Sequence, residues 1–182
     1  MIAQRNADCD IDCIDIDEGA IEEARINADN SPWSDRIHPF MSDFKQFFCD
    51  KKYDLIVSNP PFFNNGVLAP DKSRKNARHT VELSFEQLIH KAISLLSDKG
   101  KLCLISPTDL EEEITKSCAE VGAYVHQKVV IYTKPDKEPK RCLWQISKVN
   151  TDTLCSELFV QNSDGQYSEQ YIGLCKDFYM NM

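Results

Sequence analysis

The sequence lacks several features that mark specialised classes of protein. No apolar run in its 182 residues approaches the roughly 20 residues of a membrane span, and residues 1–5 lack a signal-peptide hydrophobic region. The eight cysteines include no Cys-x-x-Cys pair, so we expect reduced thiols in a cytoplasmic protein, without disulfides or a metal. The six glycines include no Gly-x-Gly, the spacing of glycine-rich loops that hold a cofactor.

Charge is unevenly distributed along the chain. The net charge of −8 argues mildly against a nucleic-acid partner. Residues 51–78, however, hold six Lys or Arg against two Asp or Glu, a net charge of +4. Residues 128–148 hold the same six against two, again +4, whereas acidic residues concentrate in 8–29 and 109–120. The average charge therefore hides two basic segments.

Apolar periodicity and turn residues predict one α/β domain over residues 1–182. Strands are expected at 10–16, 36–41, 53–58, 101–106, 126–133 and 141–149, with helices at 1–5, 19–28, 85–96, 110–120 and in the tail 171–182. Ser84 with Gln87 predicts a capping box at the start of the helix 85–96, and Asp98–Gly100 should end it. One stripe of this helix is apolar: Leu88, Ile89, Ala92, Ile93 and Leu96. Asp109 and Gly122 are expected to cap the two ends of the helix 110–120, and residues 162–165 to form a hairpin. This order predicts a Rossmann-like sheet with a late antiparallel strand pair, the outline of class I S-adenosylmethionine-dependent methyltransferases.

The motif Asn59-Pro60-Pro61-Phe62 directly follows the predicted buried strand 53–58. Prolines cannot donate to a strand ladder, and the residues before them are held extended, so a stiff loop is expected where the strand ends. The Asn59 side-chain oxygen and the Pro60 carbonyl are suited to accept from the two N–H groups of an aromatic amine, and Phe62 is suited to stack on its ring. The alternative is a structural turn that begins at Asn59.

Acidic residues at the ends of two other predicted strands suggest a cofactor site. Asp15 ends the strand 10–16, a position that commonly binds ribose hydroxyls. The neighbouring Ile16 could flank an adenine, whereas Asp17 and Glu18 have the alternative role of starting a helix. Asp43 follows the next strand and is equally compatible with accepting from adenine N6 or with a turn.

A basic element follows the Asn-Pro-Pro motif. We expect it to contact substrate phosphates, although a solvated loop is equally compatible with its composition. The candidate substrate-binding residues are Phe62, Phe63, Lys72, Arg74, Lys75, Arg78 and His79.

Four segments together resemble the bacterial valine-tRNA adenosine-37 N6-methyltransferases. They are Ile56-Val-Ser-Asn-Pro-Pro-Phe-Phe-Asn-Asn65, Ala77-Arg-His-Thr80, Leu83-Ser-Phe-Glu-Gln-Leu-Ile89, and the ending Tyr167-Ser-Glu with Lys176-Asp-Phe-Tyr179. The resemblance implies methyl transfer from S-adenosylmethionine to adenine N6 beside the anticodon of tRNA. It places the family's catalytic loop on Asn59–Phe62 and its ribose-binding acid on Asp15. Related enzymes use the same loop on DNA adenine, ribosomal-RNA guanine or a protein glutamine, so another nucleic-acid amine remains an alternative.

One part of the family's pattern has no counterpart. The first strand and its glycine-rich loop are absent, which implies an N-terminally incomplete domain. Either the sequence is truncated, or the strands ending at Asp15 and Ser58 pair directly and the chain is a non-catalytic, RNA-binding remnant. We expect a monomer, unless another chain supplies the missing strand.

Overall fold

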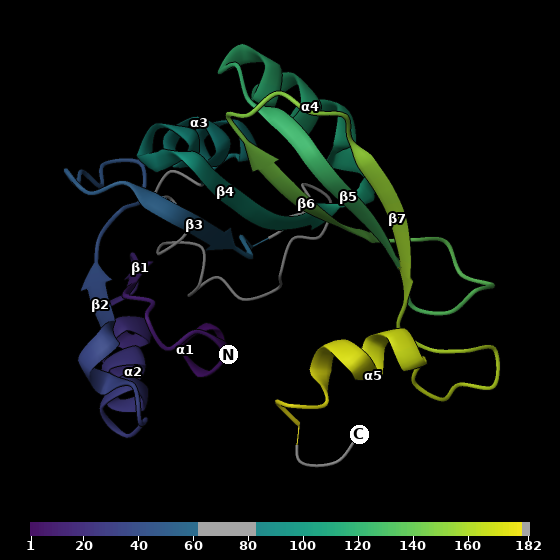
Figure 1. Cartoon of the computed structure of the whole chain (residues 1–182), viewed down its shortest axis with the longest axis horizontal. Coiled ribbons are helices and arrows are strands. Elements are labelled where there is room, and N and C mark those ends of the chain that lie inside the picture. The colour runs from purple at the N-terminus through teal and green to yellow at the C-terminus, as the bar shows by residue number, and fades with distance from the viewer. Residues whose placement is uncertain (62–82, 180–182) are drawn as a thin grey trace, which may run out of the picture. The chain divides into compact units, whose positions relative to one another are not determined.

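The computed structural model describes residues 1–61 and 83–179. The chain divides into a first unit, Met1–Cys49, and a second unit, Asp50–Met182 (Figure 1). The prediction of a single domain over residues 1–182 is not tested by this division and stays a prediction. Within the described ranges, no helix has the length and apolar character needed to cross a membrane.

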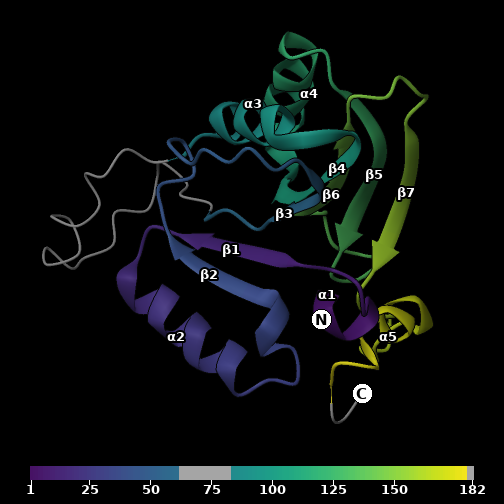
Figure 2. The same ribbon diagram turned by 60° about the vertical axis from the view of Figure 1, so that its left-hand side comes forward.

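The first unit is a small α/β element with two parallel strands (Figure 2). The strands pair from Ile11 opposite Ile37 to Asp15 opposite Met41, so their carboxyl ends share one edge. Asp17 caps the connecting helix by accepting a hydrogen bond from the Ala20 N–H at 2.7 Å. The elements of this unit are α1 (Ile2–Arg5), β1 (Ile11–Asp15), α2 (Glu18–Asp29), the 3-10 helix η1 (Ser34–Arg36) and β2 (Ile37–Met41).

Arg36 holds the start of the first unit together. Its guanidinium donates to the carbonyl oxygens of Ala3 at 3.2 Å, Asn6 at 3.0 Å and Cys9 at 2.9 Å. Carbonyls at the end of a helix have no partner within the helix. A cation there also interacts favourably with the negative end of the helix dipole. Arg36 therefore joins α1 to the segment that leads into β1.

The second unit is built on a five-stranded sheet of order β3-β4-β6-β5-β7. Helices α3 and α4 cover one face of it (Figures 1 and 2). Strand β3 is parallel to β4, β6 is antiparallel to both β4 and β5, and β7 is parallel to β5. The elements are β3 (Tyr53–Ser58), α3 (Phe85–Leu95), β4 (Leu96–Pro107), η2 (Thr108–Leu110), α4 (Glu111–Glu120), β5 (Tyr124–Tyr132), β6 (Arg141–Ser147), β7 (Leu154–Phe159) and α5 (Glu169–Cys175).

This topology confirms the predicted late antiparallel pair, which is β5 with β6. Within the first unit β1 has β2 as its neighbour, and within the second unit β3 has β4. The alternative that the strands ending at Asp15 and Ser58 pair directly would join the two units, and it stays a prediction.

The core of the second unit lies between its sheet and its helices. The predicted stripe on α3 is buried, with Ile89 and Ala92 fully inaccessible. The predicted capping box begins this helix, because Ser84 accepts from the Gln87 N–H while the Gln87 side chain accepts from the Ser84 N–H. The helix therefore starts where its local sequence directs it and is fixed by apolar burial.

The predicted helix end at Asp98-Lys99-Gly100 was wrong. Helix α3 ends at Leu95, and β4 already begins at Leu96. The pairing steps from Tyr53 opposite Leu96 to Leu55 opposite Lys101, so the intervening residues of β4 bulge from the ladder. A Cβ on Gly100 would lie 2.6 Å from the Tyr53 carbonyl oxygen. Glycine is needed here for close strand approach and not for helix termination.

The two signals predicted for α4 had different outcomes. Asp109 lies in η2, and the N-cap is Leu110 without a side-chain hydrogen bond, so the predicted Asp109 cap was wrong. Gly122 does end the helix, with φ of +65°. Its N–H donates to the Ala119 carbonyl and the Ala123 N–H to the Cys118 carbonyl, which is a Schellman motif.

The end of the chain contains a strand that the sequence reading missed. Strand β7 pairs with β5 from Leu154 opposite Gln127 to Phe159 opposite Tyr132. Residues 154–157 are all exposed, so the apolar alternation that would predict a strand is weak. The turn expected at 162–165 is present, since the Gly165 N–H donates to the Asn162 carbonyl at 3.0 Å. The helix expected over residues 171–182 is shorter and begins earlier, since α5 spans Glu169–Cys175 and is capped by Ser168.

Candidate active site

Asn59, Pro60 and Pro61 directly follow β3, as the sequence predicted. Ser58 is paired with Leu104 of β4, so the motif begins at the carboxyl edge of the five-stranded sheet, alongside the last residues of β4. Asn59 is exposed and Pro60 is buried. The backbone of the motif is therefore anchored by a buried proline, and the Asn59 amide lies at the surface beside it.

Buried hydrogen bonds support the neighbouring strand at this edge. The Trp144 indole N–H of β6 donates to the Ser106 hydroxyl at 2.9 Å, and that hydroxyl donates to the Pro107 carbonyl at 2.8 Å. Trp144 is 2% exposed and Ser106 fully buried. A satisfied polar network in a dry environment is rigid, so the end of β4 is a firm support for the Asn-Pro-Pro loop. The sequence reading did not identify this pair, which only the strand register brings together.

Asp15 and Ile16 lie at the carboxyl end of β1. The Asp15 carboxylate is exposed and one of its oxygens accepts from the Asp17 N–H at 2.9 Å. Ile16 is also exposed, at 56%. Asp17 acts as the helix cap, because it accepts from the Ala20 N–H, whereas the role of Asp15 toward a cofactor stays a prediction.

Asp43 lies next to Asp15 at the same edge of the first unit. The Ser42 N–H donates to the Asp15 carbonyl at 2.9 Å, which brings the two strand ends together. Asp43 accepts from the Lys45 N–H at 2.9 Å and its other oxygen lies 3.8 Å from the Lys45 ammonium. These contacts show the turn role that the sequence left open, and the contact with adenine stays a prediction.

The remaining predicted site residues lie outside the described residues. They are Phe62, Phe63, Lys72, Arg74, Lys75, Arg78 and His79. Their proposed roles therefore stay predictions from the sequence.

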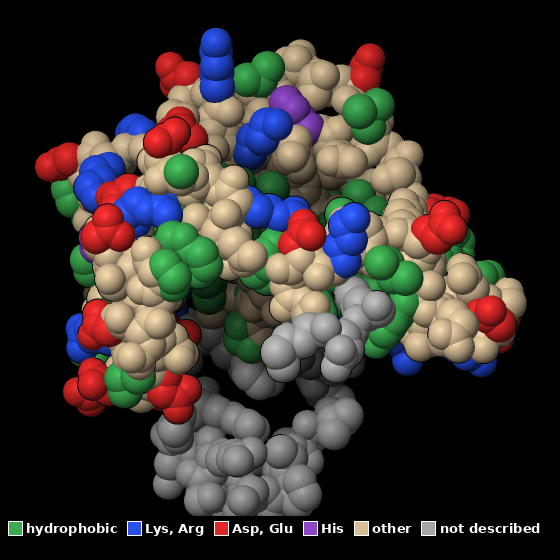
Figure 3. Space-filling model, turned by 60° about the horizontal axis from the view of Figure 1, so that its bottom comes forward, with side chains coloured by type: hydrophobic (Ala, Val, Ile, Leu, Met, Phe, Trp, Pro, Cys, Tyr) green, Lys and Arg blue, Asp and Glu red, His purple; other side chains and the backbone are tan. Residues whose placement is uncertain are grey.

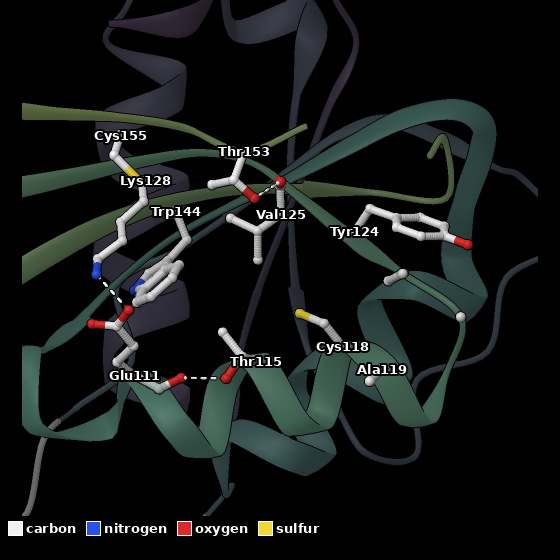
Figure 4. Close-up of a pocket in the computed structure, with 12 residues that line it drawn as sticks. Glu111, Thr115, Cys118, Ala119, Tyr124, Val125, Lys128, Trp144, Thr153 and Cys155 are labelled. Atoms are coloured by element: carbon white, nitrogen blue, oxygen red, sulfur yellow. Dashed lines mark hydrogen bonds and ion pairs between the residues drawn. The ribbon is translucent and has the colours of Figure 1, made fainter. Parts of the chain in front are cut away.

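A pocket of about 500 Å³ lies elsewhere in the second unit, between α4 and the strands β5 and β6 (Figure 4). Lys128 forms an ion pair with Glu111 at its rim, and its ammonium is 5.7 Å from the Trp144 ring centroid. Burial raises the pKa of the Cys118 thiol in this pocket to about 12, so the thiol is protonated and a poor nucleophile. None of the described residues predicted for the site line it.

One group of side chains has the residue types of a metal site. Glu86 and His90 of α3 and Glu120 of α4 place their ligand atoms within 4.8 Å of one another. Both glutamates are exposed, and His90 Nε2 lies 3.3 Å from a Glu120 oxygen. Exposed acidic groups of this kind are common in proteins without an ion, so the group carries no proposal.

Comparisons with known proteins agree with the fold and the motif. Residues 1–121 match the methyltransferase small domain family. A tRNA1(Val) (adenine(37)-N6)-methyltransferase of Phocaeicola vulgatus is 38% identical over 182 residues, covering 100% of this chain and 77% of that protein. The enzyme of the same description from Bacteroides thetaiotaomicron is 34% identical, with 100% and 77% covered.

A solved structure supports the fold independently. It is a protein of Agrobacterium tumefaciens described as a predicted O-methyltransferase, with a TM-score of 0.70 and 18% identity over 92% of this chain and 77% of that one. At this identity the likeness concerns the fold alone, and it confirms the Rossmann-like class I methyltransferase architecture. Together with the sequence relatives, it shows that the chain belongs to the methyltransferase small domain family, among the tRNA1(Val) (adenine(37)-N6)-methyltransferases.

Proposed function

We propose that this chain transfers a methyl group from S-adenosylmethionine to the exocyclic N6 of adenine in tRNA, at the position next to the anticodon. The observation that carries the proposal is the placement of Asn59-Pro60-Pro61 directly at the carboxyl end of β3. Ligands of open α/β sheets bind at this end of the strands. The reaction in the printed names of the sequence relatives supports adenine as the target base.

The chemical role of the motif follows from the electronic structure of the amine. The nitrogen lone pair of an adenine amino group is delocalised into the ring, so the group is a weak nucleophile. The Asn59 side-chain oxygen and the Pro60 carbonyl oxygen accept from its two N–H groups and orient the lone pair toward the methyl carbon. A nitrogen–carbon bond forms as the carbon–sulfur bond breaks, its electron pair stays on sulfur, and the amine releases one proton to solvent.

The residues at the end of β1 fit the adenosine part of the cofactor, which supplies an electrophilic methyl group when bound. The exposed Asp15 carboxylate has one oxygen engaged with the Asp17 N–H. Its other oxygen has no hydrogen-bond partner among the residues described, and it is suited to accept from ribose hydroxyls. The exposed Ile16 side chain offers an apolar surface for the adenine ring.

The test is Asn59→Ala in the full chain, assayed with methyl-labelled S-adenosylmethionine and unmodified tRNA. Loss of one preorganised polar contact should lower the rate by roughly a hundredfold to a thousandfold. Asn150→Ala is the matched control, because Asn150 is an exposed asparagine after β6, and it should retain the wild-type rate. Tryptophan fluorescence checks that both variants remain folded. Retained transfer by Asn59→Ala would show that the motif is not catalytic.

Nucleoside analysis of the product separates the alternatives. Label on adenine N6 supports the proposal, and label on guanine N2 of ribosomal RNA would replace it with the other nucleic-acid amine. Calorimetry with S-adenosylhomocysteine addresses the non-catalytic alternative. Absence of both transfer and cofactor binding would overturn the enzymatic proposal for this chain.

A further inference from the structure

We infer that the β5–β6 loop, residues 133–140, binds the phosphate backbone of the RNA beside the target adenine. The inference rests on the proposed function and extends it to the second basic segment of the sequence, residues 128–148. The loop carries Lys134, Lys137 and Lys140 against Asp136 and Glu138, and Arg141 follows at the start of β6. Residues 133–141 thus hold four basic and two acidic side chains, a net charge of +2. Lysine and arginine contacts to phosphate supply most of the sequence-independent affinity of proteins for nucleic acid.

The strand register places this loop on the same edge of the sheet as Asn59. Arg141 of β6 is opposite Pro107, the last residue of β4, and also opposite Ile131 near the end of β5. Strand β4 is the parallel neighbour of β3, which ends at Asn59. Neighbouring strands are about 4.8 Å apart, so the loop lies roughly 10–14 Å from Asn59 along the edge. This separation spans the next few nucleotides of a bound RNA strand.

The loop has a defined conformation at that edge. The Lys137 N–H donates to the Lys134 carbonyl at 3.1 Å, which closes a turn with Pro135 at its second position. The Thr108 hydroxyl donates to the Pro139 carbonyl at 3.1 Å, which ties the loop to the residue that follows β4. A loop held at both places needs little ordering when it binds.

The ammonium groups of the loop are accessible. Lys137 and Lys140 are exposed. Lys137 lies 3.7 Å from Asp136, but both side chains are about two-thirds exposed, at 65% and 69%. Such a surface pair is weak and exchanges readily for a phosphate. Basic and acidic side chains are mixed on the face shown in Figure 3, so a local cluster on one loop is a better candidate for RNA binding than the protein surface as a whole.

The test compares two double variants of the full chain that remove the same charge. Lys137→Ala with Lys140→Ala removes the exposed ammonium groups of the loop. Lys99→Ala with Lys116→Ala is the control, since Lys99 lies in the bulge near the start of β4 and Lys116 lies on α4 with its side chain 77% exposed. Fluorescence anisotropy measures binding of a labelled, unmodified tRNA1(Val) transcript over a series of salt concentrations.

The loop variant should bind roughly fivefold to tenfold more weakly at low salt. The slope of log affinity against log salt should fall in magnitude by about 1.4 to 1.8, the amount expected for two lost phosphate contacts. In the methylation assay its KM for tRNA should rise while kcat is retained. The control variant should match the wild type in its affinity at low salt, its salt slope and its KM for tRNA.

Equal affinity of the two variants, or a wild-type chain that does not bind the transcript, would overturn the inference. Because binding is measured without methyl transfer, this result is independent of the Asn59 test. A wild type that methylates tRNA while the loop variant binds normally would leave the proposed function standing and exclude the loop.

Discussion

The two units differ strongly in charge. Residues 1–49 hold 4 Lys or Arg and 11 Asp or Glu, a net charge of −7, whereas residues 50–182 hold 17 and 18, a net charge of −1. Almost all of the net charge of −8 therefore belongs to the first unit. The acidity that argued against a nucleic-acid partner for the whole chain does not apply to the second unit, where the Asn-Pro-Pro motif and the β5–β6 loop lie.

The units also differ in what holds them together. Among the described residues, the buried apolar side chains of the first unit are Ala3, Ile21 and Ala28, two of which are alanines. The second unit buries side chains as large as Trp144 and Ile146 across its sheet and helices. Apolar burial stabilises a fold in proportion to area. The second unit therefore has a core of its own, and the first depends more on hydrogen bonds such as those of Arg36.

Each unit contains one of the two tryptophans, so the stability of each unit can be measured separately. Trp33 lies in the first unit and Trp144 in the second. Trp144→Phe leaves only the first unit's fluorescence, and Trp33→Phe leaves only the second's. Urea unfolding in these two backgrounds reports the stability of each unit separately.

The largest expected effect comes from shortening a buried isoleucine in the second unit. Ile114 on α4 is fully buried, and Ile114→Ala should lower the unfolding free energy reported by Trp144 by about 3–5 kcal/mol, because a rigid core retains the cavity. Ile21→Ala on α2 is the matched change in the first unit. Ile21→Ala should lower the unfolding free energy reported by Trp33 by about 2 kcal/mol, since the first unit buries fewer large side chains around Ile21. If each variant shifts both signals equally, the two units unfold as one.

A smaller effect is expected from removing the Arg36 guanidinium. Arg36→Ala leaves the Ala3, Asn6 and Cys9 carbonyls without this donor. The unfolding free energy reported by Trp33 should fall by about 1–3 kcal/mol, and the one reported by Trp144 should not change. Arg25→Ala is the control, because Arg25 is 53% exposed and its ion pair with Glu22 lies at the surface. An Arg36 variant as stable as the control would show that the first unit has another source of stability.

The same contrast explains how much the sequence could predict. In the second unit, the buried stripe of α3 and the Ser84–Gln87 box agree with each other, and both were confirmed. Local signals failed where tertiary contacts decide. Gly100 was interpreted as part of a helix end. It lies instead in the bulge of β4, where the Tyr53 carbonyl approaches too closely for a side chain. Strand β7 is held by pairing with β5 and has almost no apolar pattern.

At the site, the position of Asn59 could be predicted because a strand followed by two prolines is a local pattern. It could not reveal the contact between Trp144 and Ser106, which are 38 residues apart. Nor could it place the β5–β6 loop beside the motif, since that depends on the register of β4, β5 and β6. The charge of residues 128–148 was visible, but its location on the sheet was not.

The smallest expected effects come from the helix caps, one in each unit. Asp17→Ala removes the side chain that accepts from the Ala20 N–H, and Ser84→Ala removes the one that accepts from the Gln87 N–H. Each should cost about 1 kcal/mol. The lower stability of the Asp17 variant should be reported only by Trp33 fluorescence, and that of the Ser84 variant only by Trp144 fluorescence.

The Asp17 cap variant also separates the two acids at the end of β1. Asp17→Ala keeps the Asp17 N–H that orients the Asp15 carboxylate, so the affinity for S-adenosylhomocysteine should be unchanged. Asp15→Ala should weaken that affinity by roughly tenfold to a hundredfold, because a charged hydrogen bond contributes about 1.5–3 kcal/mol. Calorimetry on both variants measures the difference. Equal weakening by the two would mean that the cofactor depends on the start of α2 as a whole, and Asp15 would lose its assignment as the ribose ligand.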